Sequence, residues 1–475
     1  MRMQRLLVVI LCGIALTGCK KWEDHNAITD DALTKNLFQQ ISAETTLSKF
    51  TELLKKSGYD TVIASSRVFT VFAPTNDALA TLDAGIVNDA SKLKAFVGSH
   101  IATQHYFTTS ATALTKVAML NGKYHSMLNK TVDDAEISGA DKYAKNGVLQ
   151  VINKMLPALN NCWEALEYDA SLPAKQKNYM LSLFRNVFDL THAEQTGVNP
   201  VTGEPIYKPG TDSIRTNLFW RNVYDLRDES KEFTLFLLED AAWDMEVNKF
   251  SVLCAANTAD STTAFSSLET LKDLATDTLW QPAAIRDTVY SKFKVKIPVT
   301  KTEIVRTVRT SNGIIYIMRK VDITLANKVQ EIIIQGENYR TTLVDRRSNT
   351  YFRDRVNTLT GKDYKDVMVF NHGVANFYLN YRLRNMYSVK YKAYWVAVND
   401  FQAAAFSQKL AINDPTTLLL PYTVVNANTF SEVYLGEFPL ATYQTVLDLY
   451  LTAANSTTAA VNPLVCDYIR LVPSL

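Results

Sequence analysis

The residue types best suited to binding a ligand are concentrated between positions 378 and 395. Aromatic and cationic side chains alternate there with aliphatic ones. Aromatic rings pack against the C–H faces of sugars while guanidinium groups bond to hydroxyls, so this mixture favours a glycan-binding surface. A structural explanation competes with it, because tyrosine and tryptophan are common on both faces of sandwich strands. The candidate binding residues are Tyr378, Arg382, Arg384, Tyr387, Tyr391, Tyr394 and Trp395.

Sequence patterns that would indicate catalysis or a metal are missing. The chain has no His-Glu-x-x-His, Cys-x-x-Cys, Gly-x-Ser-x-Gly or phosphate-binding Gly-Lys-Ser/Thr pattern. His100 and His105 lie five residues apart, with His125 as a potential partner, but no cysteine or clustered carboxylate accompanies them. A hydrogen-bonded core histidine is the better explanation for His100. We therefore expect a protein that is not an enzyme and that needs no cofactor and no metal.

Length and charge narrow the function further. A chain of 475 residues indicates about three domains. Removing residues 1–18 would take away two of the 50 basic residues and none of the 48 acidic ones, which leaves the charges balanced. A balanced chain without a long basic run argues against nucleic acid as a partner. The cysteines Cys162, Cys254 and Cys466 are far apart and odd in number, so we expect them to be free core residues.

The N-terminus resembles an export and anchoring signal. Two arginines precede an apolar run at 6–16, which is too short to span a bilayer but typical of a signal peptide. The run ends in Leu-Thr-Gly-Cys, which resembles the lipobox of bacterial lipoproteins and implies cleavage before Cys19 and lipid attachment to it. Acidic residues soon afterwards resemble the tag that sends some Gram-negative lipoproteins to the outer face of the outer membrane. We expect a signal peptide at 1–18 and a lipidated tether at 19–33; the alternative is a soluble secreted protein.

A strand-to-helix corner is predicted at the stretch Phe-Thr-Val-Phe-Ala-Pro-Thr-Asn-Asp-Ala, residues 69–78. The apolar residues suit a buried strand, and Pro74 should end it. Thr75 can then cap a helix, and Asp77 would lie favourably in its first turn. A structural corner is the preferred explanation. If the corner also has a surface role, Asn76 and Asp77 are the candidates to mutate.

Helix and turn signals surround this corner. An apolar stripe at 47–54 predicts a helix that ends at Gly58, and another at 93–101 predicts a helix that carries His100 near its end. Asn121-Gly122 and Asn146-Gly147 are typical of tight turns.

Together these segments resemble the fasciclin domain. The box at 69–78, the helix that ends at His100 and the box Asn-Gly-Val-Leu-Gln-Val-Ile at 146–152 are similar to the marks of that family, although Ser99 stands where the family usually has tyrosine. The resemblance implies a compact α/β domain over residues 34–158, with a β-sandwich-like core wedged by helices.

A divergent second copy follows the first. Residues 233–242 align with the corner at an offset of 164, and residues 311–318 align with the last box at an offset of 166. Two boxes displaced by nearly the same amount indicate an internal repeat, which we assign to residues 177–325. Leu238-Glu239 replaces the proline and threonine of the corner, so Asp240 would have to cap the following helix.

From residue 330 the sequence alternates with period two. Phe377, Leu379, Tyr381 and Leu383 would share one face of a strand, which predicts an antiparallel sandwich over residues 329–475. Its last strand resembles that of the jelly-roll sandwiches found in carbohydrate-binding modules. The expected fold is therefore α+β: two fasciclin-like domains followed by an all-β, jelly-roll-like sandwich.

These resemblances imply an outer-membrane-anchored surface lipoprotein with a non-catalytic binding or assembly role. Lipoproteins of this design resemble accessory members of glycan-capture systems. The implied partners are a polysaccharide, and a TonB-dependent transporter with its lipoprotein lid. The alternative function is cell-surface adhesion through the fasciclin-like domains.

Overall fold

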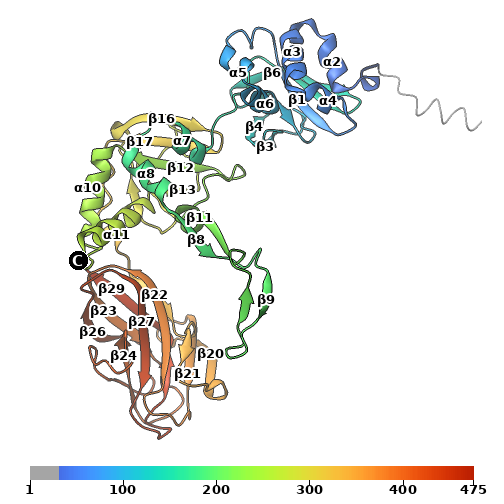
Figure 1. The fold of residues 1–475 in the computed structure, drawn as a ribbon. Helices are drawn as coiled ribbons and strands as arrows, with labels where there is room; N and C mark the ends of the chain where they lie inside the picture. Colours follow the sequence, from blue (N-terminus) through green and yellow to red (C-terminus); the bar gives the residue numbers. More distant parts are fainter. Residues whose placement is uncertain (1–30) are drawn as a thin grey trace, which may run out of the picture. The chain divides into compact units, whose positions relative to one another are not determined.

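The computed structural model describes residues 31–475 (Figure 1). The expected signal peptide, the lipidation site Cys19 and most of the 19–33 tether lie outside the described residues. The chain divides into two compact units: the first comprises the described residues up to 169 together with 226–233 and 309–314, and the second comprises 170–225, 234–308 and 315–475. Within the described part, helices and many β-strands occur together, which confirms the α+β class. No helix in that part is long and apolar enough to cross a membrane.

The first copy is built on a seven-stranded sheet in the order β2-β1-β7-β6-β5-β4-β3. Two neighbouring strands, β1 and β7, run parallel, and every residue in both is buried. The strands are β1 (Phe69–Pro74), β2 (Ile101–Ala102), β3 (Thr115–Ala118), β4 (Tyr124–Leu128), β5 (Thr131–Val132), β6 (Ala135–Ala144) and β7 (Gly147–Ile152). The helices of the first unit are η1 (Asp31–Thr34), α2 (Leu37–Ala43), η2 (Thr45–Leu47), α3 (Ser48–Ser57), α4 (Tyr59–Ala64), α5 (Ala84–Asn88), α6 (Ala90–Gly98) and α7 (Cys162–Tyr168).

Several local predictions for this copy are confirmed. Helix α3 ends at Gly58, which adopts the left-handed conformation (φ 77°) that glycine tolerates best. His100 is completely buried; its Nδ1–H donates to the carbonyl of Phe96 (2.8 Å), and its Nε2 accepts from the N–H of Leu156 (2.9 Å). It is a core histidine, as expected.

The corner after β1 differs from the prediction, because no helix begins there. Pro74 is the last residue of the strand, residues 76–81 form turns, and the next helix starts only at Ala84. The Thr75 hydroxyl does accept from the N–H of Ala78 (3.2 Å). The N–H of Asn76, however, donates to the carbonyl of Thr46 (2.8 Å), so a tertiary bond holds the backbone where local capping favoured a helix.

The second copy repeats the central part of this sheet. Its strands lie in the order β13-β12-β17-β16, which matches β2-β1-β7-β6. They are β12 (Phe233–Leu238), β13 (Ala275–Thr276), β16 (Ile304–Thr310) and β17 (Gly313–Met318), with the hairpin β14 (Thr288–Tyr290) and β15 (Lys296–Pro298) nearby. The helical segments are α8 (Ala174–Ser182), α9 (Leu218–Asn222), α10 (Asp240–Ser251), α11 (Ala259–Leu271), η3 (Lys301–Glu303) and α12 (Leu325–Lys328).

Two expectations for the second copy need correction. Helix α10 begins directly after the strand, but its N-cap is Glu239 and no side chain caps it; Asp240 instead accepts from the N–H of Lys175 (2.8 Å). The copy also begins before residue 177. Helix α7 donates the N–H of Cys162 to Asn312 (2.8 Å), as α2 donates the N–H of Leu37 to Asn146 (2.9 Å).

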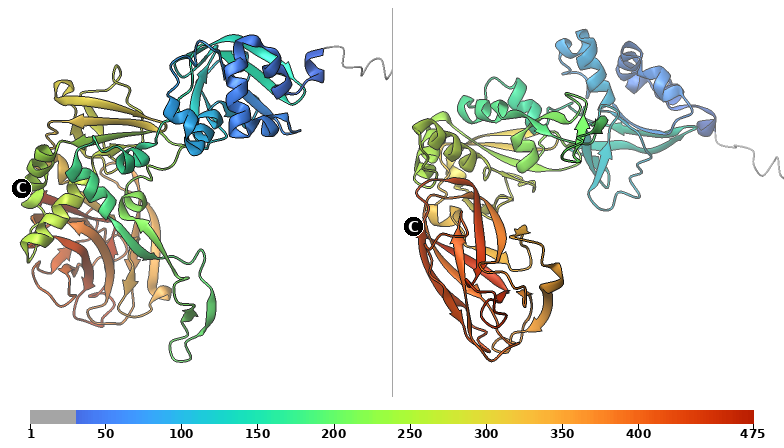
Figure 2. Two further views of the ribbon diagram at one scale, coloured as in Figure 1. Left: turned by 45° about the horizontal axis from the view of Figure 1, so that its top comes forward. Right: turned by 60° about the horizontal axis from the view of Figure 1, so that its bottom comes forward.

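A β-ribbon is inserted between α8 and β12. It consists of β8 (Phe184–Phe188) paired with β11 (Ser213–Asn217), and β9 (Gln195–Val198) paired with β10 (Pro205–Tyr207). The left view of Figure 2 shows the ribbon projecting as a green arm away from the helices of the copy. No residue from 184 to 216 is buried. Residues 199–204, between β9 and β10, form the tip of this arm.

The C-terminal residues form the expected β-sandwich. One sheet has the order β18-β29-β23-β26, the second β19-β22-β27-β24-β25, and a small third sheet β20-β21-β28. The facing sides of the sheets share one apolar core. The strands are β18 (Ile332–Gln335), β19 (Thr341–Thr342), β20 (Thr350–Val356), β21 (Asp363–Val369), β22 (Tyr378–Met386), β23 (Lys390–Val396), β24 (Phe406–Ile412), β25 (Thr423–Val425), β26 (Val433–Pro439), β27 (Gln444–Ala453), β28 (Leu464–Cys466) and β29 (Tyr468–Ser474), with the short helix η4 (Arg347–Asn349).

Candidate binding surfaces

The outer face of β22 and β27 brings together three of the predicted binding residues. Tyr378, Arg382 and Arg384 alternate with core residues along β22, so they point away from the sandwich interior. On β27, Tyr450 lies opposite Asn380 and Asp448 lies opposite Arg382. This set of outward side chains is called the β22–β27 face below.

Aromatic and ionic contacts order this face. The rings of Tyr378 and Tyr450 meet edge to face, with their centroids 5.0 Å apart. Arg382 donates to both carboxylate oxygens of Asp448, at 2.9 and 2.8 Å. The hydrogen bonds from Arg382 lower the pKa of Asp448, so the pair is charged at neutral pH. The face therefore offers ring surface beside a fixed guanidinium.

Tyr394 lies on the other sheet of the sandwich. Its ring lies 5.2 Å from that of Tyr434, and the guanidinium of Arg470 sits 4.7 Å from the Tyr394 ring centroid. Arg470 also bonds to Glu432 and to Glu331, and these acids neutralise it. Tyr394 thus belongs to a second aromatic surface and not to the β22–β27 face.

The prediction of a binding role was wrong for three residues, because their side chains are buried. Tyr391 and Trp395 are each 1% exposed, because on β23 they alternate with the outward residues and face the core. Tyr387 is 9% exposed, and its hydroxyl donates to Glu269 at 2.5 Å. None of these three side chains can reach a ligand on the surface.

The contact of Tyr387 belongs to a buried polar network that the sequence did not reveal. Glu269 of α11 is 1% exposed and accepts from two sandwich tyrosines, Tyr387 and Tyr443 (2.8 Å). Lys328, whose side chain is fully buried, pairs with both Glu269 (3.4 Å) and Asp273. These residues are called the Glu269 network below; they join the second copy to the sandwich inside the second unit.

Charges in the Glu269 network compensate one another. Burial alone would raise the pKa of Glu269, but Lys328 and Lys272 outweigh it and hold that pKa at about 2. The pKa of Tyr387 is raised well above its usual value, first by burial and then by the charge of Glu269. The carboxylate is therefore ionised and the tyrosines are protonated donors, an arrangement suited to structure rather than to proton transfer.

Asn76 and Asp77, the candidates at the first corner, have different environments. The side chain of Asn76 accepts from the N–H of Lys49 (3.0 Å) and donates to the carbonyl of Thr45 (3.0 Å), so it holds the start of α3. Asp77 is exposed. Asn76 has a structural role.

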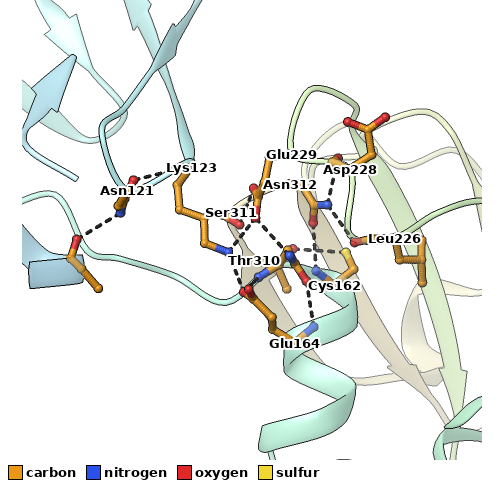
Figure 3. Close-up of polar contacts among 12 residues, drawn as sticks. Asn121, Lys123, Cys162, Glu164, Leu226, Asp228, Glu229, Thr310, Ser311 and Asn312 are labelled. Atoms are coloured by element: carbon orange, nitrogen blue, oxygen red, sulfur yellow. Dashed lines mark hydrogen bonds and ion pairs between the residues drawn. The ribbon is translucent and has the colours of Figure 1, made fainter. Parts of the chain in front are cut away.

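A polar cluster in the first unit is held together by ion pairs and hydrogen bonds (Figure 3). Lys123, in the turn before β4, pairs with Glu164 of α7 (2.5 Å) and with Glu229 (2.6 Å). Glu229 also accepts from Ser311 (2.8 Å) and Asn161 (3.1 Å). The two carboxylates share one ammonium group and accept further hydrogen bonds from Asn161 and Ser311, so the cluster has a structural role.

Groups with metal-binding potential are limited in the described chain. Across residues 31–475 no group of three or more histidine, cysteine, aspartate or glutamate side chains is arranged to hold a metal ion. Cys162, Cys254 and Cys466 are free and buried, as predicted.

Comparison with known proteins identifies the first copy. A family model described as the fasciclin domain matches residues 45–158. Protein sll1483 of Synechocystis sp. is 30% identical over 140 residues, which covers 27% of this chain and 76% of that protein. The transforming growth factor-beta-induced protein ig-h3 of Sus scrofa is 29% identical over 129 residues, which covers 26% of this chain and 18% of that protein.

Solved structures with similar parts have low overall similarity. The FAS1 domain pair of the insect cell adhesion molecule fasciclin I has 16% identity and a TM-score of 0.25, covering 60% of this chain and 99% of that one. A family 35 carbohydrate binding module from Clostridium thermocellum has 16% identity and a TM-score of 0.21, covering 30% of this chain and 98% of that one. Given the match of the family model and a 30% identical relative covered over 76% of its length, the chain belongs to the fasciclin-domain family.

Proposed function

We propose that this protein is a lipid-anchored protein of the outer membrane surface that captures polysaccharide without catalysis. The observation that carries the proposal is the β22–β27 face, where the ring pair of Tyr378 and Tyr450 lies beside the bidentate pair of Arg382 and Asp448. Apolar ring surface next to oriented polar groups is the combination that sugars require.

The Glu269 network supports the proposal because it holds the sandwich, and with it the β22–β27 face, rigidly against the second copy. Backbone bonds reinforce it: the N–H of Ser388 donates to Leu253 (2.8 Å), and the N–H of Tyr443 donates to Ala255 (2.7 Å). A binding face held on a rigid base loses less conformational entropy when it captures a ligand.

Affinity electrophoresis in gels that contain plant, fungal and bacterial polysaccharides tests glycan capture. We expect the purified protein to be retarded by at least one of them, and Tyr378→Ala to reduce the retardation. Tyr434→Ala is the matched control, because Tyr434 is 53% exposed on the other sheet. Binding that survives Tyr378→Ala and is lost in Tyr434→Ala would move the site to the Tyr394 surface; no retardation in any gel would contradict glycan capture.

Anchoring and partnership form a separate part of the proposal. Labelling cells with an alkyne fatty acid should mark the wild-type protein and not Cys19→Ala. A pull-down from solubilised outer membranes should recover a TonB-dependent transporter and its lipoprotein lid. An unlabelled wild-type protein would contradict the anchor, and a pull-down without the transporter would contradict the partnership.

Adhesion is the second candidate function, and the β-ribbon favours it. Six large apolar side chains are exposed on this arm: Phe188, Leu190, Val198, Val201, Ile206 and Ile214. An isolated two-stranded ribbon is only marginally stable, so a partner that covers the arm would stabilise it. Replacing Val201 and Ile206 with serine should reduce attachment of cells to protein-coated surfaces if adhesion is the function, and should leave growth on polysaccharides unchanged.

A further inference from the structure

The β22–β27 face carries more positive charge than its own carboxylate can neutralise. Arg382 uses its guanidinium to bind Asp448. Arg384, two residues further along β22, is exposed on the same face. Arg340 precedes β19, where its N–H donates to the carbonyl of Asn380 (2.7 Å). Its charge contributes, after the hydrogen bonds of Arg382, to lowering the pKa of Asp448, which places Arg340 beside the same carboxylate.

Two of these three arginines are unengaged. Within residues 31–475, neither the Arg340 nor the Arg384 guanidinium takes part in an ion pair or a side-chain hydrogen bond. Arg382 and Arg340 therefore act on the single carboxylate of Asp448, and Arg384 lies opposite Val446, one outward position further along β22. A single exposed cation needs no partner, but three arginines on a face with the one carboxylate of Asp448 create a local excess of positive charge that attracts anions.

The aromatic pair lies on the same face as these arginines. Side chains on one face of a strand are about 7 Å apart, so Tyr378 and Arg384 span roughly 20 Å along β22. Asn380 lies between Tyr378 and Arg382; it is 2% exposed, and its Oδ1 has no hydrogen-bond partner. At that burial Asn380 supports the face from below and is not itself a ligand contact; its side chain contributes to lowering the pKa of Asp448.

We propose that the β22–β27 face binds an acidic polysaccharide, whose sugars carry carboxylates or sulfate esters. The inference rests on the proposed glycan capture and names the class of glycan. The planar forks of Arg340 and Arg384 match the two oxygens of a carboxylate or sulfate, and the rings of Tyr378 and Tyr450 take the C–H faces of the intervening sugars. A neutral glycan would use the rings but leave both free guanidinium groups without anionic partners.

The test compares acidic and neutral polysaccharides with the purified protein in affinity gels. Probes are polygalacturonate and alginate for carboxylates, dextran sulfate and carrageenan for sulfate esters, and dextran, xylan and laminarin as neutral glycans. Binding to the first or second group supports the inference and identifies the anion. Binding to neutral glycans alone overturns it while leaving glycan capture intact, and binding to none overturns both.

Variants locate the site and separate it from general charge attraction. Arg340→Gln and Arg384→Gln should each weaken binding of the acidic probe about tenfold, and raising NaCl from 0.05 to 0.5 M should weaken it further because salt screens exposed charges. Arg319→Gln is the matched control, since Arg319 is exposed in the second copy. An equal loss in Arg319→Gln, or equal binding of poly-glutamate, would overturn the inference.

Discussion

The two fasciclin copies share a set of buried hydrogen bonds between side chains and backbone, and they differ in the segments that surround these bonds. Asn146 and Asn312 make the same bonds: each side chain accepts one helix N–H and donates to two carbonyl oxygens, and each carbonyl accepts from the first residue of the central strand. Thr70 and Thr234 also correspond, since each hydroxyl donates to one carbonyl at 2.7 Å and accepts one N–H at 2.9 Å.

The surroundings of these contacts have diverged. The first copy follows its strand with turns, whereas the second continues directly into α10. The second copy also carries the β-ribbon and the Glu269 network, and a leucine, Leu274, stands where the first copy has His100; both carbonyls accept from the central strand (2.8 Å). The buried bonds therefore define the fold, while the corner and the insertions can change.

The largest expected effect comes from the glycines after the two asparagines. A Cβ at Gly147 would lie 2.0 Å from the carbonyl oxygen of Phe69, and one at Gly313 would lie 2.3 Å from that of Phe233. Gly147→Ala and Gly313→Ala should each cost about 4 kcal/mol or more, because backbone must move. Hydrogen–deuterium exchange should show the loss of protection confined to the copy that carries the change. Gly197→Ala is the control, because a Cβ there would meet open space. A Gly313→Ala variant as stable as the wild type would show that the two copies are not equivalent at this position.

The Glu269 network should give the next largest effect. Glu269→Ala leaves Lys328 with only part of its partners in a buried site, which typically costs about 3–5 kcal/mol. We expect thermal unfolding to separate into two transitions, because the second copy and the sandwich would no longer unfold together. Tyr443→Phe removes one donor and should cost about 1 kcal/mol. A single unshifted transition in Glu269→Ala would show that the network does not couple the two parts.

The first copy should be sensitive to acid because of His100. Burial lowers the pKa of His100 to about 3, against about 6.5 when unfolded. Its neutral form is favoured in the fold, so this contribution is complete above pH 6.5 and is lost as pH falls toward 3, by at most about 1.4 kcal/mol per pH unit. The free energy of unfolding, measured between pH 4.5 and 7.5, should depend less on pH in His100→Leu than in the wild type. This variant carries the leucine that the second copy has at the matching position. An unchanged slope would assign the acid sensitivity to other groups.

The corner should give the smallest effect. Asn76→Ala removes hydrogen bonds that hold the start of α3 and should cost about 1 kcal/mol. Asp77→Ala should change the unfolding free energy by less than about 0.5 kcal/mol, because the side chain is exposed. Chemical denaturation compares the two variants directly. A larger cost for Asp77→Ala would contradict a structural role limited to Asn76.

Local backbone chemistry made much of the fold predictable from the sequence. The helix end at Gly58 and the Asn-Gly turns depend on neighbouring residues, and the structure contains them. The internal repeat was visible because two boxes of sequence recur at nearly the same offset. The prediction of a helix directly after Pro74 was wrong, because the conformation there depends on hydrogen bonds to Thr46 and Lys49, which lie in another segment.

The binding residues were predictable only in part for a similar reason. Period-two alternation correctly puts Tyr378, Arg382 and Arg384 on one outer face. The same alternation puts Tyr391 and Trp395 inside, which a count of aromatic residues does not reveal. The partner of Tyr387 is 118 positions away, and no local pattern identifies it.

The Glu269 network also determines how this protein should be dissected. A fragment that starts at residue 329, where the sequence suggests a boundary, would omit Lys328 and Glu269 and leave the hydroxyls of Tyr387 and Tyr443 without their acceptor. Such a fragment would expose a surface that is normally interior, so it should aggregate or fold poorly. A missing glycan signal from the isolated sandwich would then report damage at the cut, whereas a fragment that retains α11 and α12 would report specificity.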